Sequence, residues 1–386
     1  MKHSSQIAVS NLYGYLAGHS KNRGKRSIRP DPVGARELFG IQMLRALAGL
    51  AVVTHHSLEQ SNGALGRFSP DWLTTSGASG VDIFFVVSGF IMLHVSFGSR
   101  RASVPAPSFL YRRATRIYPL YWLCCMAMFA ASLAGLLAHH HWGDRALLAS
   151  LLLAPNSNPL IFVAWTLVYE IYFYLIFAAT LPYQSIGVSV VGTNLAVIGF
   201  ALSGFALPQG AVRDFLTNPI PLEFCMGLWL SWAFARQTER GKPWPIGFAP
   251  GVIGVALLAL AAVVVHHRST AGLDGFPRVL FWGVPSVLVV AAFLGLQKPQ
   301  SAALRFAVLI GNASYALYLT HVFVMLAYAK LQKTTIIGRI DQRWVVPCVI
   351  VLAVAIAIAT HLLLERPMLA GVRRITKRQP EYALSA

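Results

Sequence analysis

Apolar stretches of about bilayer length recur along most of this chain, and they constrain its fold more than any other feature. Each is near the ~20 residues that a transmembrane helix needs. Ten can be delimited: 41–58, 79–97, 117–138, 160–181, 186–207, 219–235, 246–266, 277–296, 306–328 and 344–364. Only 12% of the residues are charged, about half of the ~25% usual in soluble domains. The sequence therefore predicts an all-α, polytopic membrane protein with about ten transmembrane helices.

The net charge of +18 gives an orientation, because Lys and Arg gather in cytoplasmic loops. With the N-terminus inside, the inner segments carry 22 Lys and Arg and the outer loops carry 8. Half of those eight lie in one discordant loop, 329–343. The asymmetry predicts that both termini are cytoplasmic. Since it accounts for the basic charge, we predict no nucleic-acid partner.

The chain is predicted to hold one transmembrane domain, residues 37–370, between two basic cytoplasmic segments. These are an N-terminal arm, residues 1–36, placed to touch membrane lipids, and a tail, residues 371–386. The apolar piece 146–154 is too short to span a bilayer and is expected to be re-entrant or interfacial. The four cysteines and the histidine run 139–141 lack metal-ligand spacing or partners, so we predict no metal and no disulfide.

Ionisable residues occur in only some of the apolar stretches. A charge at the centre of a helix costs ~2.5–3.5 kcal/mol on insertion scales, so such groups are expected to face one another or a wet cavity. Each one alone is compatible with a satisfied structural pair, but together they indicate a shared polar chamber. The residues are Arg45, His55, His56, Asp82, Glu170, Glu223 and His321.

Arg45 and His56 are the strongest catalytic candidates. Their separation of eleven residues places them on one helix face, about 16 Å apart along the axis. Histidine exchanges a proton near neutral pH, and arginine stays charged and can hold a carbonyl oxygen, a thioester or a phosphate. The alternative is that His56 only caps a helix end in the membrane interface.

Further candidates for the chamber are polar side chains of later spans. Asp82 is placed to orient an imidazole by accepting its N–H. Glu170 lies among aromatic residues, which favours a sugar or acyl pocket, although aromatic residues near a membrane end are commonly anchors. In the ninth apolar stretch, Ser314, Tyr318 and His321 have the spacing i, i+4, i+7 and therefore form a polar stripe on one helix face. The full second-rank set is Asp82, Glu170, Glu223, Ser314, Tyr318 and His321.

Three arginines follow the second apolar stretch: Arg112, Arg113 and Arg116. They are expected on the cytoplasmic side by the charge count. Guanidinium groups match phosphate oxygens, so the cluster is a candidate clamp for a cytosolic phosphate-bearing cofactor. The alternative is that the arginines only set the orientation in the membrane.

Taken in order, these motifs resemble the acyltransferase-3 family of integral membrane acyltransferases, which includes O-antigen and exopolysaccharide O-acetylases. The resemblance covers about residues 37–370. It implies ten helices and the transfer of an acyl group, usually acetyl from cytosolic acetyl-CoA, to a glycan hydroxyl. It places the essential Arg and His of the family on Arg45 and His56, and its arginine motif on Arg112, Arg113 and Arg116. The segments are RALAGLAVVTHH (45–56), GVDIFFVVSGF (80–90), YRRATRIYPLYW (111–122), WTLVYEIYFY (165–174), PLEFCMG (221–227), GNASYALYLTH (311–321) and LLLERP (362–367).

The resulting expectation is an O-acyltransferase of the bacterial inner membrane that acts on a surface or exported glycan or a lipid-linked sugar. His56 would be the general base or a transient acyl carrier, and Arg45 would hold the thioester or the oxyanion. Acyl-CoA would be a co-substrate, with no bound cofactor. A chain that ends at 386 without an esterase-like domain favours the exopolysaccharide or O-antigen type. The alternatives are a glycolipid transporter or flippase and a structural subunit of an export complex; no oligomeric state is predicted.

Overall fold

The computed structural model describes residues 38–65, 69–97, 103–137, 142–245, 247, 249–266, 273–296, 300–334 and 336–377. The N-terminal arm, the histidine run 139–141 and the tail beyond 377 lie outside these residues. Within them the chain forms helices and no strand, so the all-α prediction is confirmed. The α-helices are α2 (Phe39–Leu65), α3 (Asp71–Ser76), α4 (Gly80–Phe97), α5 (Ala106–Leu133), α6 (Asp144–Leu152), α7 (Trp165–Thr180), α8 (Ile186–Gly204), α9 (Ala211–Thr217), α10 (Pro221–Glu239), α11 (Ala249–His266), α12 (Gly275–Arg278), α13 (Val284–Phe293), α14 (Ala302–Asn312), α15 (Ser314–Thr334), α16 (Gln342–Thr360) and α17 (Arg366–Lys377). Short 3₁₀ or π turns complete several of them: η1 (Gly77–Ser79), η2 (Phe162–Ala164), η3 (Leu181–Tyr183), η4 (Val279–Gly283), η5 (Ile336–Arg339) and η6 (His361–Glu365).

The number of membrane spans differs from the expected ten. Among the described residues, six helical segments are long and apolar enough to cross a membrane, or up to seven if a bent pair counts as one span. The polar residues of α2 and α10 lower their apolar character, although both occupy expected stretches. Ten spans are therefore not confirmed, and the cytoplasmic termini stay a prediction. The six segments are Asp71–Phe97, Ala106–Leu133, Phe162–Tyr183, Ile186–Gly204, Gly275–Phe293 and Gln342–Val372.

The stretch 306–328, predicted as a single span, is broken in the structure and forms one span only if the bent pair is counted together. The structure has two helices there, α14 and α15, which meet at 73° around Ala313. Gly311 at the end of α14 lies against α2 so closely that an added Cβ would be 1.8 Å from the carbonyl oxygen of Gln42. This close approach fixes α14 on α2, and the bend then leads α15 along another side of α2.

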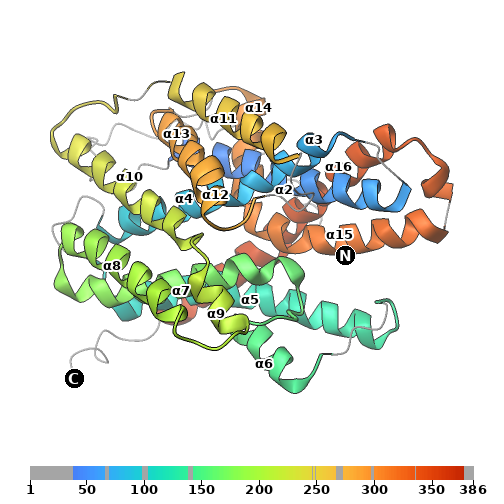
Figure 1. Cartoon of the computed structure of the whole chain (residues 1–386), viewed down its shortest axis with the longest axis horizontal. Coiled ribbons are helices and arrows are strands. Elements are labelled where there is room, and N and C mark those ends of the chain that lie inside the picture. Colours follow the sequence, from blue (N-terminus) through green and yellow to red (C-terminus); the bar gives the residue numbers. More distant parts are fainter. Residues whose placement is uncertain are drawn as a thin grey trace, which may run out of the picture.

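Helix α2 lies in the middle of the bundle and contacts α4, α14, α15 and α16 (Figure 1). Glycines permit its closest approach to the start of the second span. An added Cβ at Gly77 would lie 2.3 Å from the carbonyl oxygen of Ala51, and one at Gly80 would lie 2.4 Å from that of Ala48. Small residues allow such close packing of helices in membranes. The consequence is that α3, η1 and the start of α4 lie directly beside α2.

Helices α4 and α10 pack through a matching pair of glycines. An added Cβ would lie 2.0 Å from the carbonyl oxygen of Phe224 at Gly89, and 2.2 Å from that of Val86 at Gly227. Their backbones therefore touch, which brings the buried Glu223 of α10 against α4.

The piece expected to be too short to span forms the nine-residue helix α6. It lies with α7, α8 and α9 in the lower half of Figure 1. The last carbonyl groups of a helix lack partners within it. Here three aromatic side chains of α5 donate to them: Tyr121 to Ser150 at 2.7 Å, Trp122 to Leu151 at 2.9 Å and Tyr118 to Leu152 at 3.1 Å.

Candidate active site

A polar cavity of about 190 Å³ lies between α2, α4, α5, α7 and α15. Its charged lining consists of Arg45, Arg113, Arg116 and Glu170. Three guanidinium groups against one carboxylate leave the cavity positively charged. Such a set, next to apolar walls that weaken solvent screening, favours an anionic group with several acceptor oxygens.

The side chains of the cavity are held by neighbours on different helices. Glu170 accepts hydrogen bonds from the Ser88 hydroxyl, at 3.2 Å, and from the Tyr174 hydroxyl. The Arg45 guanidinium donates to the Gln42 side chain at 3.2 Å. Arg113 lies 5.4 Å from the ring centre of Tyr174, within cation–π range. Each guanidinium carries five N–H groups, more than these contacts use, so donors are left for a ligand in the cavity.

The arginine cluster predicted from the sequence divides in the structure. Arg113 and Arg116 line the cavity together with Arg45. Arg112 is exposed and lies outside that lining. At 100° per residue, Arg116 lies between Arg112 and Arg113 on the helix circumference, and the cavity faces the side of Arg113 and Ile117, which leaves Arg112 at the outer edge.

One wall of the cavity is apolar. Ile41, Phe84, Val87 and Ile91 face the polar groups across it. This combination of cationic and apolar walls suits a ligand that carries both an anionic part and a short apolar part.

His56 lines a second hollow, of about 370 Å³. Gln60, Phe162, Met325 and Lys333 are among the residues that line it with His56. Arg45 does not line this hollow, and His56 does not line the first. The two candidates therefore come from one helix, as expected, but open into separate spaces.

Two residues of α15, Tyr318 and His321, connect the linings of the two hollows by ring contacts, and this pair is called the partition below. Tyr318, which lines the first cavity, donates a hydrogen bond to the Val163 carbonyl and accepts one from the Thr166 hydroxyl at 2.8 Å. The buried His321 lies 6.4 Å from the Tyr318 ring and stacks on His56, with centroids 5.4 Å apart and planes 23° from parallel. The predicted stripe on α15 thus meets α2 between Arg45 and His56, with Ser314 in the lining of the first cavity.

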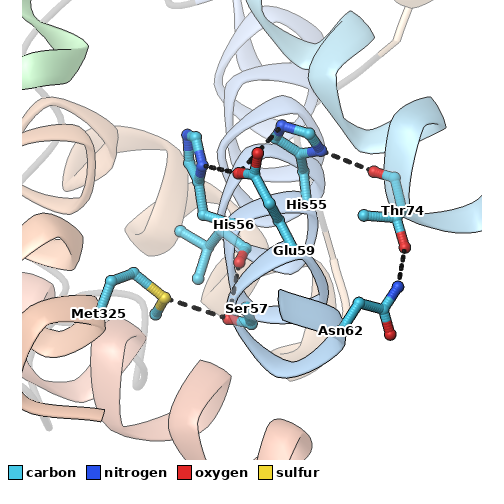
Figure 2. A network of polar contacts seen from close by, with 8 residues as sticks. His55, His56, Ser57, Glu59, Asn62, Thr74 and Met325 are labelled. Carbon is cyan, nitrogen blue, oxygen red and sulfur yellow. Dashed lines mark hydrogen bonds and ion pairs between the residues drawn. The ribbon is translucent and has the colours of Figure 1, made fainter. Parts of the chain in front are cut away.

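Figure 2 shows a network of polar side chains around His56. The His55 Nδ1 lies 2.7 Å from the Thr74 carbonyl oxygen, and the His56 Nδ1 lies 3.2 Å from Oε2 of Glu59. The His55 Nε2 faces the same carboxylate oxygen at 3.8 Å. Ligand atoms of these three residues lie within 4.8 Å of one another, close enough for one metal ion. The expectation of no metal was drawn without this cluster and stays a prediction.

Comparison with known proteins identifies the chain. A family model described as an acyltransferase domain, acyltransferase-3, matches residues 38–362. The exopolysaccharide production protein ExoZ of Rhizobium meliloti (strain 1021) is 33% identical over 317 residues, which cover 78% of this chain and 93% of ExoZ. The chain belongs to the acyltransferase-3 family.

A second relative, the acyltransferase MdmB of Streptomyces mycarofaciens, is 27% identical over 88% of this chain and 94% of MdmB. No solved structure gives a significant match. The family makes this protein an acyltransferase, and its apolar helices make it a membrane protein.

The structure gives Asp82 a different partner from the imidazole expected from the sequence. Instead of accepting an N–H from an imidazole, the fully buried Asp82 accepts two hydrogen bonds from Arg278, at 3.0 and 2.9 Å. Arg278 also lies 5.2 Å from the Trp282 ring. Glu223 is fully buried on α10, where the π turn η4 leaves room for it: an added Cβ at Gly283 would be 2.9 Å from its Oε1. Asp82 and Arg278 form a buried ion pair, Glu223 lies near them, and none of the three lines either hollow.

Sequence reasoning missed three polar residues of the site. Arg278 lies at the start of the predicted span 277–296 and has no role among the sequence predictions, although a buried Asp82 needs a cationic partner, which is the available signal. Gln42 gave no signal, since its bond to Arg45 depends on an i, i+3 spacing that is common in helices. Glu59 was overlooked because it lies just past the expected end of the first span, at 58, whereas α2 continues to Leu65.

Proposed function

We propose that this acyltransferase moves an acyl group, most simply acetyl, from cytosolic acyl-CoA to a hydroxyl of an exported glycan or a lipid-linked sugar. The observation that carries the proposal is the cationic cavity that Arg45, Arg113 and Arg116 share inside a membrane acyltransferase. The similarity to an exopolysaccharide production protein over 78% of the chain supports a polysaccharide as the acceptor.

The three arginines have distinct uses in this proposal. Guanidinium groups bind phosphate oxygens through paired hydrogen bonds, so Arg113 and Arg116 suit the phosphates of CoA. Arg45 suits the thioester carbonyl, whose oxygen gains negative charge as the hydroxyl attacks. The apolar wall at Phe84 and Ile91 suits the acyl chain and the pantetheine arm.

His56 suits the proton transfer. When the sugar hydroxyl attacks the thioester carbon, the new C–O bond forms, the C–S bond breaks, and the hydroxyl proton passes through His56 to the CoA thiolate. In the alternative, His56 carries the acyl group transiently before the sugar takes it. Both versions require the thioester carbon to pass the partition at Tyr318 and His321.

The chain is proposed to lie in the bacterial inner membrane with the arginine cavity toward the cytoplasm. The 22 to 8 asymmetry of basic residues supports this orientation, because it puts residues 98–116 on the inner side. Acyl-CoA then meets the cavity from the cytosol, and the hollow at His56 meets the acceptor from the other side.

The deciding experiment measures release of free CoA thiol by purified protein given acetyl-CoA and glycan from the source cell. We expect thiol and ester to form in equal amounts, and we expect His56→Ala and Arg45→Gln to lose both products. A glycolipid transporter would release no thiol. Lack of thiol release above these variants, together with movement of labelled glycolipid across vesicles that contain the protein, would replace the acyltransfer proposal with the transporter.

A further inference from the structure

The proton positions on the two neighbouring histidines of α2 follow from their partners. A backbone carbonyl can only accept a hydrogen bond, so the His55 Nδ1 next to the Thr74 oxygen carries a proton. A carboxylate can also only accept, so the His56 Nδ1 next to Glu59 carries one too. A neutral imidazole has a single N–H, and the Nε2 of each ring is therefore the bare nitrogen.

Glu59 is suited to hold His56 in this tautomer. It lies three residues on in the same helix, where side chains of positions i and i+3 are neighbours. Its Oε2 is the atom that faces His56 at 3.2 Å and His55 at 3.8 Å. His55 cannot donate to that oxygen from its bare Nε2, so the hydrogen bond to the carboxylate belongs to His56. In Figure 2 Glu59 reaches up between the two rings.

Two further rings, of Phe162 and His321, contact the His56 ring. Phe162 meets it edge-on at 5.5 Å, and His321 stacks on it at 5.4 Å. The Nδ1 of His321 lies 3.0 Å from the Leu317 carbonyl oxygen, which fixes its proton there. The remaining charged group of this hollow among the described residues is Lys333 at its rim. Glu59 is thus the carboxylate in contact with His56, and His55, His321 and Lys333 are the other titratable groups around it.

We propose that Glu59 is the positioning residue for His56: its carboxylate keeps the proton on Nδ1, leaves Nε2 free to take the proton of the acceptor hydroxyl, and stabilises the imidazolium that results. The inference rests on the proposed role of His56 as a base. The orienting role was expected of Asp82, whose carboxylate instead accepts two hydrogen bonds from Arg278.

Solvent limits how strongly the Glu59 carboxylate can influence His56. The Glu59 side chain is 57% exposed, so water screens its charge on His56. We expect a loss of about tenfold in kcat for Glu59→Gln, well below the ~10⁴-fold that a buried orienting carboxylate supplies in a serine protease triad. The same exposure means that the substitution removes no core packing, so the variant is expected to fold.

The test compares Glu59→Gln and Glu59→Asp with the parent in the thiol-release assay over a range of pH. Loss of the negative charge disfavours the protonated imidazole. The acidic limb of the kcat/KM profile is therefore expected to move to lower pH in Glu59→Gln, with the KM for acetyl-CoA unchanged. Glu59→Asp should keep the parent's limb and recover part of kcat. Glu239→Gln, an exposed acid at the end of α10, is the matched control and should equal the parent.

Three results would overturn the inference. The first is a Glu59→Gln variant with the parent's kcat and pH limb while His56→Ala is inactive, which leaves the proposed function standing without Glu59. The second is activity that EDTA removes and Zn²⁺ restores in the parent, because the cluster of His55, His56 and Glu59 would then be a metal site. The third is an active His56→Ala variant, which defeats the proposed base itself and, with it, the need for a positioning residue.

Discussion

Arg45 and His56 lie on one helix eleven residues apart, yet each opens into its own hollow, with Tyr318 and His321 between them. In the proposed function, a donor held by the arginines and an acceptor held near His56 would therefore be kept apart until the partition lets the acyl group through. Such an arrangement would protect the thioester from water that enters with the acceptor.

The first prediction concerns the Tyr318 hydroxyl, which bonds the partition to the backbone and side chain of neighbouring residues. Tyr318→Phe removes the hydrogen bonds to Val163 and Thr166 and keeps the ring. We expect more acetyl-CoA hydrolysis without ester formation, seen as a ratio of thiol to ester above one. Thr320→Val is the control, since the Thr320 hydroxyl donates within its own helix, to the Ala316 carbonyl. An unchanged ratio in Tyr318→Phe would show that this bond does not hold the partition.

His321 can affect His56 in two ways, through the stacking of its ring and through its ring nitrogens, and two substitutions distinguish them. His321→Phe keeps an aromatic ring against His56 but removes both nitrogens, whereas His321→Ala removes the ring as well. If the stack orients His56, His321→Phe should retain most of kcat and His321→Ala should lose about tenfold, in line with the ~1.4 kcal/mol that corresponds to a factor of ten in rate. Thiol release at saturating acetyl-CoA measures this. Equal losses in both variants would assign the effect to the His321 nitrogens.

The divided arginine cluster offers an internal control for donor binding. Arg113→Gln and Arg116→Gln each remove a charge from the cavity lining, and Arg112→Gln removes one from an exposed position next in sequence. We expect the KM for acetyl-CoA to rise about tenfold for the first two, since a hydrogen bond to a charged group contributes ~1.5–3 kcal/mol. It should stay at the parent value for Arg112→Gln. A KM that rises equally in all three would mean that the arginines act through the general potential of the surface.

Much of the fold was open to prediction because lipid leaves a chain few choices. Apolar stretches of bilayer length must form helices, and each of the ten predicted stretches coincides with helix in the structure. The bend at Ala313 was not predictable from apolar length, since it depends on how Gly311 meets the backbone of Gln42. The end of α2 was also not predictable from apolar length, because polar residues end the apolar stretch at 58 while the helix continues to Leu65.

The candidate site was predictable as a set of residues and not as a set of contacts. Buried charge marked Arg45, Asp82 and Glu170, because polar groups in spans are costly without partners. Which partner each would take depends on helix packing over long sequence separations, as for Asp82 and Arg278, which are 196 residues apart. No local spacing encodes such a pairing.

That pairing gives the last prediction, which concerns stability. Asp82 is fully buried and Arg278 nearly so, and their two hydrogen bonds neutralise charges that lipid and protein would otherwise leave without a partner. Breaking a buried pair by removing one member typically costs ~3–5 kcal/mol, whereas replacing both members with apolar residues of similar volume is often neutral or stabilising. We therefore expect Asp82→Leu and Arg278→Met each to lower the free energy of unfolding in detergent by about 3 kcal/mol or more. The double variant should recover most of this loss, which SDS titration followed by tryptophan fluorescence would measure. Since the pair lies outside both hollows, the double variant should also retain thiol release. A stable double variant without activity would place Asp82 and Arg278 in the catalytic machinery after all.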